Sequence, residues 1–398
     1  MSTAVGVNPS QIAFRRHDLD ALRAVAMVAG IVLHTANAFF SWPAAITVSG
    51  ASDDRWFDEI YYVIHGFRMP LFFVISGYFS ALVVGRYGPA LYAKQRTVRI
   101  LVPLMLFGVV LVPAVNVMSD RFGDPGFVRY PQFSLHHLWF LWVLWLFAIG
   151  YAGMSFLGQR FVKSTGDARE GEAPSARLVA IAAGVLVSAT AVLHIVNELT
   201  IAAALIGPPI QTGLIISDTL LAYYLAFFLF GVVTYRSHFQ AGPSYLDCLR
   251  SLWAPTLGCT VFFVTPLMFM TSPRAELQGV VTGVIEITYA WGMIIGVTGL
   301  FGAILSQERP GIRYLSDASY WLYLIHIPFV LAGQRLVRDL AIPHTVSFLL
   351  ILGVTIGAAL ATYAVFVRST VLGVLLNGRR YPRARPAPQK ETRSFVQV

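Results

Sequence analysis

The sequence predicts an all-α protein, a polytopic transmembrane helical bundle of about ten helices. Of its 398 residues, 56% are hydrophobic and 12% are charged, which is about half the charged share of an ordinary soluble domain. Charged residues are missing from long runs and collect between them, as membrane-spanning helices require. The runs 178–193 and 346–367 are apolar on every side, whereas transmembrane β-strands alternate every second residue. The composition therefore excludes a soluble domain and favours helices over a barrel.

Apolar runs of roughly membrane-spanning length follow one another along the chain. They cover residues 20–40, 60–84, 97–118, 135–157, 178–206, 214–236, 249–270, 279–305, 319–339 and 346–367. The longest connection, 158–177, carries charges together with glycine, serine and proline. We therefore divide the chain into an N-terminal tail (1–17), a membrane domain (18–367) and a basic C-terminal tail (368–398).

The 29 Lys and Arg residues predict the orientation of the bundle. If the N-terminus lies in the cytoplasm, 21 of them fall on cytoplasmic segments, six on outer loops, and two, Arg23 and Arg68, inside helices. Membrane proteins concentrate positive charge on the cytoplasmic side. We therefore expect both termini in the cytoplasm and a bacterial inner membrane as the location. The same rule explains the net charge of +9 without a nucleic-acid partner.

Two local patterns raise further alternatives. Cys248 and Cys259 lack the CxxC or Cys/His spacing of a disulfide framework or metal site, so we expect no metal and no permanently bound cofactor. Ala36-Asn37-Ala38 resembles a signal-peptidase site after the first apolar run. The polar stripe on that run favours a helix that is kept.

The first helix carries Arg23 and His34 on one face. The eleven steps between them make three turns plus about 20° and separate the two residues by about 16 Å along the axis. Gly30 and Asn37 fall on the same stripe, so a neighbour or a substrate can approach closely there. Because ionisable residues inside a membrane helix are costly, this stripe indicates a functional site more strongly than a snorkelling arginine and an ordinary buried histidine.

The second helix places His65 and Ser76 on one face, with Arg68 one turn from His65. Arg68 lies too deep in the span to reach the interface easily, so its charge needs an anion. Two partners remain open at this point. One is Glu286 in the eighth helix, and the other is a bound substrate.

Arg96 and Arg99 begin the third helix at the cytoplasmic surface, three residues apart and therefore on one side of the helix. A pair of guanidinium groups suits phosphate oxygens, and Arg23 lies at the same level. Together they predict an anion-binding mouth, although the positive-inside rule alone also accounts for the pair.

Two later helices carry polar faces whose roles remain open. Tyr320, Tyr323 and His326 share a face of the ninth helix, and His194 and Glu198 share a face of the fifth. Pairing within the bundle and contact with an acceptor at the outer side are equally compatible with this spacing.

Several of these segments together resemble the acyltransferase 3 family of integral membrane acyltransferases. The resemblance spans about residues 20 to 330 and rests on Asp20-Ala-Leu-Arg23 with ten residues to His34, Phe72-Phe73-Val-Ile-Ser76-Gly77-Tyr78, Arg96-Thr-Val-Arg99, His137-Leu-Trp-Phe-Leu and Ser319-Tyr-Trp-Leu-Tyr-Leu-Ile-His326. Within the family, the segment that begins at His65 most resembles the glucan biosynthesis branch, which is similar in adding succinyl groups to periplasmic glucans.

The resemblance implies a membrane O-acyltransferase. It would move an acyl group from cytoplasmic acyl-CoA to a hydroxyl of a periplasmic glucan or other glycan, with succinyl favoured and acetyl as the alternative. His34 is then the catalytic base or a transient acyl carrier, and Arg23, Arg96 and Arg99 hold the CoA phosphates. The expected substrate-binding residues are His65, Arg68, Ser76, Glu286 and His326.

Two other functions remain open from the sequence. A carrier or flippase for an anionic metabolite would use Arg68 and Glu286 as substrate and coupling sites, but no inverted repeat supports it. A membrane subunit without catalytic activity is the third alternative.

Overall fold

The computed structural model describes residues 16–39, 55–123, 134–164, 175–200, 206–236, 251–271 and 279–381. Throughout this part the chain forms helices and no strands, which confirms the predicted all-α bundle. The helices are α1 (His17–Ala36), η2 (Asn37–Phe39), α2 (Trp56–Tyr87), α3 (Pro89–Arg96), η4 (Thr97–Leu101), α4 (Val102–Phe122), η5 (His136–Leu138), α5 (Trp139–Ser164), α6 (Ala176–Thr200), α7 (Asp218–Arg236), α9 (Trp253–Cys259), η7 (Thr260–Val264), α10 (Thr265–Thr271), α11 (Val280–Ile304), α12 (Pro310–Val337), α13 (His344–Thr362), η9 (Tyr363–Val367) and α14 (Val371–Asn377).

Within the described residues, nine helical spans are long and apolar enough to cross a membrane. The run expected at 319–339 corresponds to α12, which has 28 residues but is not among these nine. One side of α12 carries Ser316, Ser319, His326 and Gln334, and all four are buried against neighbouring helices. These polar side chains make α12 less apolar than the other spans. They are tolerated because this side of α12 packs against neighbouring helices and not against lipid.

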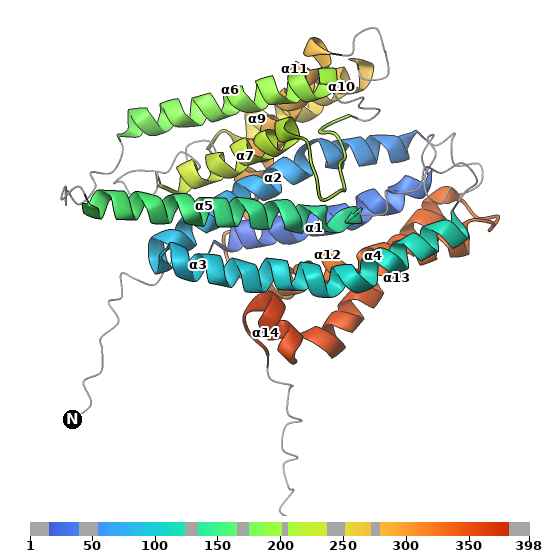
Figure 1. Ribbon diagram of the computed structural model, residues 1–398. Coiled ribbons are helices and arrows are strands. Elements are labelled where there is room, and N and C mark those ends of the chain that lie inside the picture. The colour runs from blue at the N-terminus through green and yellow to red at the C-terminus, as the bar shows by residue number, and fades with distance from the viewer. Residues whose placement is uncertain are drawn as a thin grey trace, which may run out of the picture.

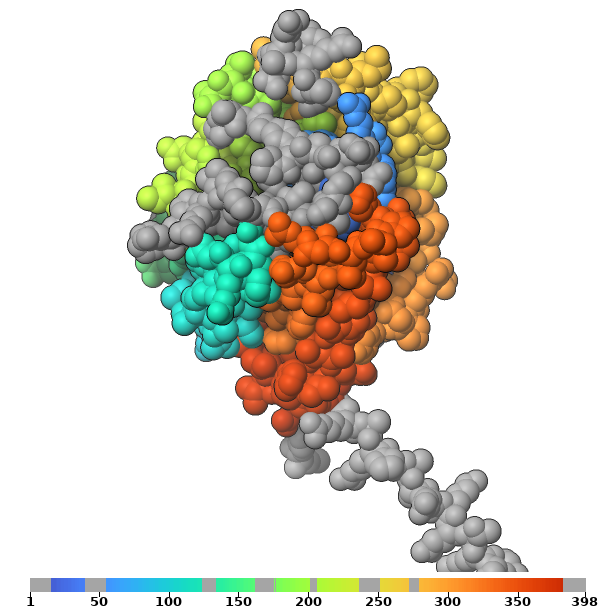
Figure 2. Space-filling view, turned by 90° about the vertical axis from the view of Figure 1, so that its right-hand side faces the viewer, coloured from blue at the N-terminus to red at the C-terminus, as the bar shows by residue number. Residues whose placement is uncertain are grey.

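The long helices run side by side (Figure 1). The buried shares of their apolar spans are larger for α1, α2, α7 and α11 than for α4, α6, α10 and α13. Burial separates the two groups: 67% of the apolar span of α2 is buried, against 17% of that of α6. Figure 2 shows the bundle on end, with α6 in green, α10 in yellow and α13 in red-orange at its periphery. The peripheral helices therefore face the lipid with side chains such as Val109 and Phe262, which are among the exposed apolar residues.

The closest helix contact joins α2 to α7 through two glycines. A Cβ atom on Gly77 would lie 1.8 Å from the carbonyl oxygen of Phe228, and one on Gly231 would lie 2.0 Å from that of Val74. Helices in membranes associate by close packing of small residues, since lipid removes the hydrophobic driving force between them. These glycines allow α2 and α7 to approach backbone to backbone.

Helix boundaries differ from the expected runs mainly at one end of the bundle. The third run begins earlier, because Gly88 (φ 79°) turns the chain between α2 and α3 and Pro89 then starts α3. The ninth run also begins earlier, with Pro310 at the start of α12. Residues 1–15 of the predicted N-terminal tail and 382–398 of the predicted C-terminal tail lie outside the described residues, as do residues 165–174 of the predicted loop 158–177. The first part of that loop is helical, because α5 continues to Ser164.

Candidate functional site

Three histidines from separate parts of the chain meet inside the bundle. The ring of His34 in α1 lies 5.2 Å, centre to centre, from that of His326 in α12. The ring of His137, in η5, lies 5.1 Å from His326 on its other side. Gln334, two turns farther along α12, donates a hydrogen bond of 2.9 Å to the backbone carbonyl of His34. The predicted site residues His34 and His326 are therefore neighbours, held by the contact between α1 and α12.

Arg68 of α2 completes this cluster on the side of Gly30. A Cβ atom on Gly30 would lie 1.9 Å from Nη1 of Arg68, so only glycine leaves room for the guanidinium group at that place. The charge of Arg68 acts on His34, His137 and His326. Its Nε is buried without a hydrogen-bond partner, and no carboxylate in the described part of the chain pairs with it. The charge of Arg68 is therefore not balanced by any carboxylate of the described residues.

Backbone carbonyls fix the tautomers of the two neighbouring histidines. Nδ1 of His326 lies 2.8 Å from the carbonyl oxygen of Tyr323, so this nitrogen carries the proton and donates it. Nε2 of His326 then holds a lone pair, and it is buried with no partner. In the same way, Nε2 of His137 donates to the carbonyl of Leu324 at 3.0 Å and leaves Nδ1 unprotonated and without a partner. The cluster therefore presents unused basic nitrogens beside the guanidinium group.

The two central side chains of this cluster keep some accessible surface. His34 and Arg68 are only half-buried although both lie inside the bundle, so open space adjoins them. Ser76 lies eight residues beyond Arg68 on α2, about 12 Å along the helix axis, and the structure does not bring it to the histidines.

His65 and Glu286 serve the packing of a buried loop. Nε2 of His65 donates to the carbonyl of Pro208 at 2.9 Å, and the backbone N–H of Gly207 donates to Oε2 of Glu286 at 3.0 Å. Glu286 also lies 3.0 Å from Nε2 of His194. The possible ion pair between Arg68 and Glu286 is therefore not formed, because the carboxylate is already engaged by α6 and by this loop.

At the other end of α1, the predicted arginines approach one another through α12. Nη2 of Arg23 lies 3.4 Å from Oγ of Ser316, and one turn later Tyr320 donates a 2.9 Å hydrogen bond to the backbone carbonyl of Arg99. Arg23 also pairs with Asp20, with the nearest atoms 3.8 Å apart. Arg23 and Arg99 thus lie against successive turns of α12.

The predicted fork of Arg96 and Arg99 is not formed as a single unit. The guanidinium group of Arg96 stacks over the ring of Tyr92, 5.2 Å from its centre, and that of Arg99 lies against Gly378 after α14. The π-helical turn η4, which contains Arg99, alters the regular spacing that the fork requires. Arg96 and Arg99 nevertheless remain close enough for their charges to repel each other.

Sequence reasoning missed His137 as a member of the site. Its neighbour His136 has a φ of 47°, a left-handed conformation that residues other than glycine rarely adopt. This turn lets His137 enter the bundle while Nε2 of His136 contacts Oδ1 of Asn116 at 2.8 Å. The doublet of histidines at a predicted membrane interface was the available signal.

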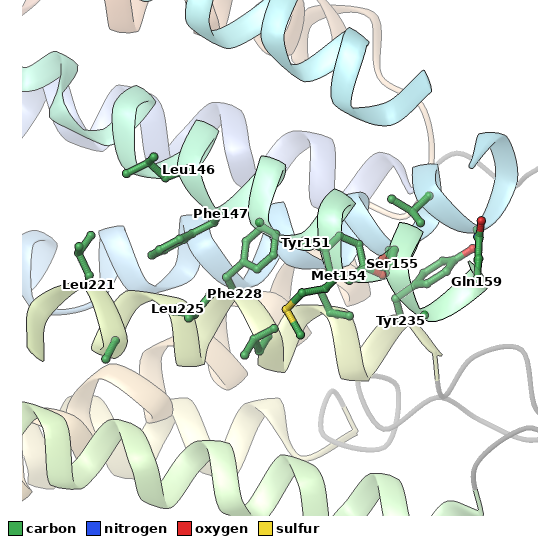
Figure 3. A pocket seen from close by; sticks show the side chains of 18 of the residues that line it. Leu146, Phe147, Tyr151, Met154, Ser155, Gln159, Leu221, Leu225, Phe228 and Tyr235 are labelled. Carbon is green, nitrogen blue, oxygen red and sulfur yellow. The ribbon is translucent and has the colours of Figure 1, made fainter. Parts of the chain in front are cut away.

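A separate cavity of about 1320 Å³ lies between α2, α5 and α7 (Figure 3). Its walls include Phe147 and Met154 of α5 and Leu225 and Phe228 of α7, as Figure 3 shows. Asp218 is the only charged residue among those lining it, and no predicted site residue does so. The cavity is therefore an apolar space distinct from the histidine cluster.

Comparison with known proteins supplies independent evidence. A family model described as an acyltransferase domain matches residues 16–367. The chain is 25% identical over 410 residues to Glucans biosynthesis protein C of Salmonella heidelberg (strain SL476), covering 96% of this chain and 98% of the relative. It is also 25% identical over 395 residues to the protein of that name from Escherichia coli O1:K1 / APEC, covering 92% and 95%. No solved structure matches the chain significantly.

Proposed function

Because the chain belongs to the acyltransferase 3 family and is a multi-pass membrane acyltransferase, we propose that it transfers an acyl group from cytoplasmic acyl-CoA to a hydroxyl of a periplasmic glucan. The observation that carries this proposal is the cluster of His34, His326 and Arg68 inside the bundle, with a positive surface at one end. The curated relatives are named for glucan biosynthesis, which supports a glucan acceptor. The distribution of Lys and Arg supports the inner membrane and cytoplasmic termini.

His34 is the proposed catalytic residue. As general base it takes the proton of the sugar hydroxyl while the hydroxyl oxygen attacks the thioester carbonyl. The C–S bond then breaks and the proton passes to the CoA sulfur, which leaves a sugar ester and free CoA. In the alternative route His34 itself accepts the acyl group and passes it on. Both routes use the open space beside its ring.

Arg23, Arg96 and Arg99 are the proposed contacts of the CoA phosphates. All three lie at the end of the bundle where α1 begins and α4 starts, and Arg23 is about 16 Å from His34 along α1. Phosphates held at this end leave the pantetheine arm to span the distance to His34. Ser76, half-buried on α2, lies between the two levels and is a proposed contact of that arm.

Arg68 supports succinyl as the transferred group. A buried guanidinium group without a carboxylate partner is costly, and a succinyl donor carries a free carboxylate that would pair with it. His326 and His65 are the proposed neighbours of this end of the substrate. Glu286 is already bound to His194 and Gly207, so it contributes through the loop that it holds.

The test of the function separates binding from chemistry. In His34→Ala, transfer from labelled succinyl-CoA to glucan should fall by about 10² to 10⁴-fold, while CoA binding and yield of folded protein stay near those of the parent protein. His344→Ala, the same change at the start of α13, is the matched control and should retain transfer. A loss of transfer that only follows the loss of folded protein would show that His34 is structural.

A second measurement tests the acyl group. The ratio of succinyl to acetyl transfer should fall in Arg68→Ala, because only the succinyl donor has a carboxylate for Arg68 to bind. An unchanged ratio, normalised to folded protein, would remove the succinyl assignment and leave the acyltransferase itself intact.

A further inference from the structure

A second polar cluster lies where α6 ends and α11 begins, at the end of the bundle opposite to α3 (Figure 1). His194 and Glu198 stand one turn apart on α6, and Glu286 faces them from α11. The nitrogen and oxygen atoms that these three side chains offer lie within 4.8 Å of one another. His194 is 1% exposed and Glu286 is 3% exposed, whereas Glu198 is half-buried.

The hydrogen bonds leave the two carboxyl groups of this cluster only partly paired. Oε2 of Glu286 accepts from the N–H of Gly207 and from Nε2 of His194. Oε1 of Glu198 is buried with no partner, and no hydrogen bond joins the two carboxyl groups. No Lys or Arg of the described residues pairs with either carboxylate. Two carboxylates in such a place are strongly unfavourable unless a cation balances them.

We propose that His194, Glu198 and Glu286 bind a divalent cation, for which zinc has the best-matched ligand set. One imidazole nitrogen and two carboxylate oxygens are ordinary zinc ligands, and three protein ligands leave a fourth position for water. The charges balance, since one divalent cation and two carboxylates sum to zero. Binding replaces the hydrogen bond between His194 and Glu286 by bonds from each to the metal. It also gives Glu198 Oε1 the partner that it lacks.

The cation would act as a clamp between helices. It joins α6 to α11, and Glu286 in turn holds the N–H of Gly207. The next residue, Pro208, accepts the hydrogen bond of His65, one turn from Arg68 on α2. The metal therefore fixes the buried loop that anchors His65. This inference stands on the cluster alone and does not depend on the acyl donor or acceptor.

The experiment measures metal in the full-length protein, purified in lipid nanodiscs with a tag that contains no histidine. After growth with zinc and exhaustive dialysis, elemental analysis should find about one zinc per chain. Titration of the stripped protein with zinc chloride against a chromophoric chelator gives the affinity, and thermal unfolding with and without zinc gives the stabilisation. Loss of one ligand in Glu198→Gln or Glu286→Gln should weaken zinc binding by at least 10- to 100-fold.

Glu198→Gln is the more informative variant, because Oε1 of Glu198 has no hydrogen bond that the change would break. Glu59→Gln, an exposed carboxylate near the start of α2, is the matched control and should keep its zinc. The proposal is overturned if the parent protein binds no zinc and its melting temperature does not change when zinc is added. It is equally overturned if Glu198→Gln binds zinc as tightly as the parent protein, since the metal would then lie elsewhere. Unfolding that depends on pH but not on zinc would assign the cluster to protonation instead.

Discussion

Gly30→Ala replaces one hydrogen atom by a methyl group beside the guanidinium group of Arg68. The new Cβ would lie 1.9 Å from Nη1, whereas non-bonded atoms separate to about 3.5 Å. Nη1 must therefore move by about 1.5 Å. The neighbour is the far end of a flexible side chain, so the arginine moves and the helices stay in place. The helix itself gains about 1 kcal/mol from replacing glycine by alanine, which offsets a rotamer cost of about 0.5–1.5 kcal/mol in Arg68.

We expect Gly30→Ala to fold as well as the parent protein and to transfer poorly. A misplacement of about 1 Å in a site of this kind can lower the rate by about 10²-fold, so succinyl transfer should fall by about that factor. The assay compares transfer per folded molecule and melting temperature for Gly30→Ala and for Gly353→Ala. A Cβ on Gly353, in the exposed face of α13, meets no atom within 4 Å, so this control gains the same helix propensity without touching the site. Full activity in Gly30→Ala would refute the role of Arg68, and loss of folded protein would refute the claim that Arg68 can swing aside.

Three further predictions test the fold and the positive end of the bundle. Gly231→Ala should lower the stability by about 1–3 kcal/mol, measured by unfolding, because its Cβ would strike the backbone carbonyl of Val74 and separate α2 from α7; unchanged stability would contradict that packing. Arg99→Ala should weaken CoA binding about tenfold in a calorimetric titration, since a charged hydrogen bond contributes about 1.5–3 kcal/mol; unchanged affinity in the double variant with Arg96→Ala would leave these arginines with a role in topology only. A reporter fused to the C-terminus should be cytoplasmic and one inserted in 119–134 periplasmic, and a periplasmic C-terminus would refute the orientation.

The helical spans were predictable because each one satisfies its own backbone and must be apolar over most of its length. The stripe of Arg23 and His34 was also predictable, because α1 is one continuous helix and its periodicity fixes which residues share a face. The pair of Arg96 and Arg99 was less predictable. The π-helical turn at 97–101 and the stacking of Arg96 on Tyr92 depend on neighbours that helical periodicity does not describe.

The class of fold, the resemblance to the acyltransferase 3 family and the candidacy of His34 could all be inferred from the sequence alone, since these depend on composition and on spacing along single helices. Only the tertiary structure decided which helices meet. In the tertiary structure His137 lies beside His326, Arg68 has no carboxylate partner among the described residues, and Glu286 pairs with His194. A charged residue inside an apolar run can be recognised in the sequence of one helix, and its burial is costly. The group that offsets this cost belongs to another helix, so it cannot be read from the same run. Which partner is within about 3 Å depends on packing between residues as distant in sequence as His194 and Glu286.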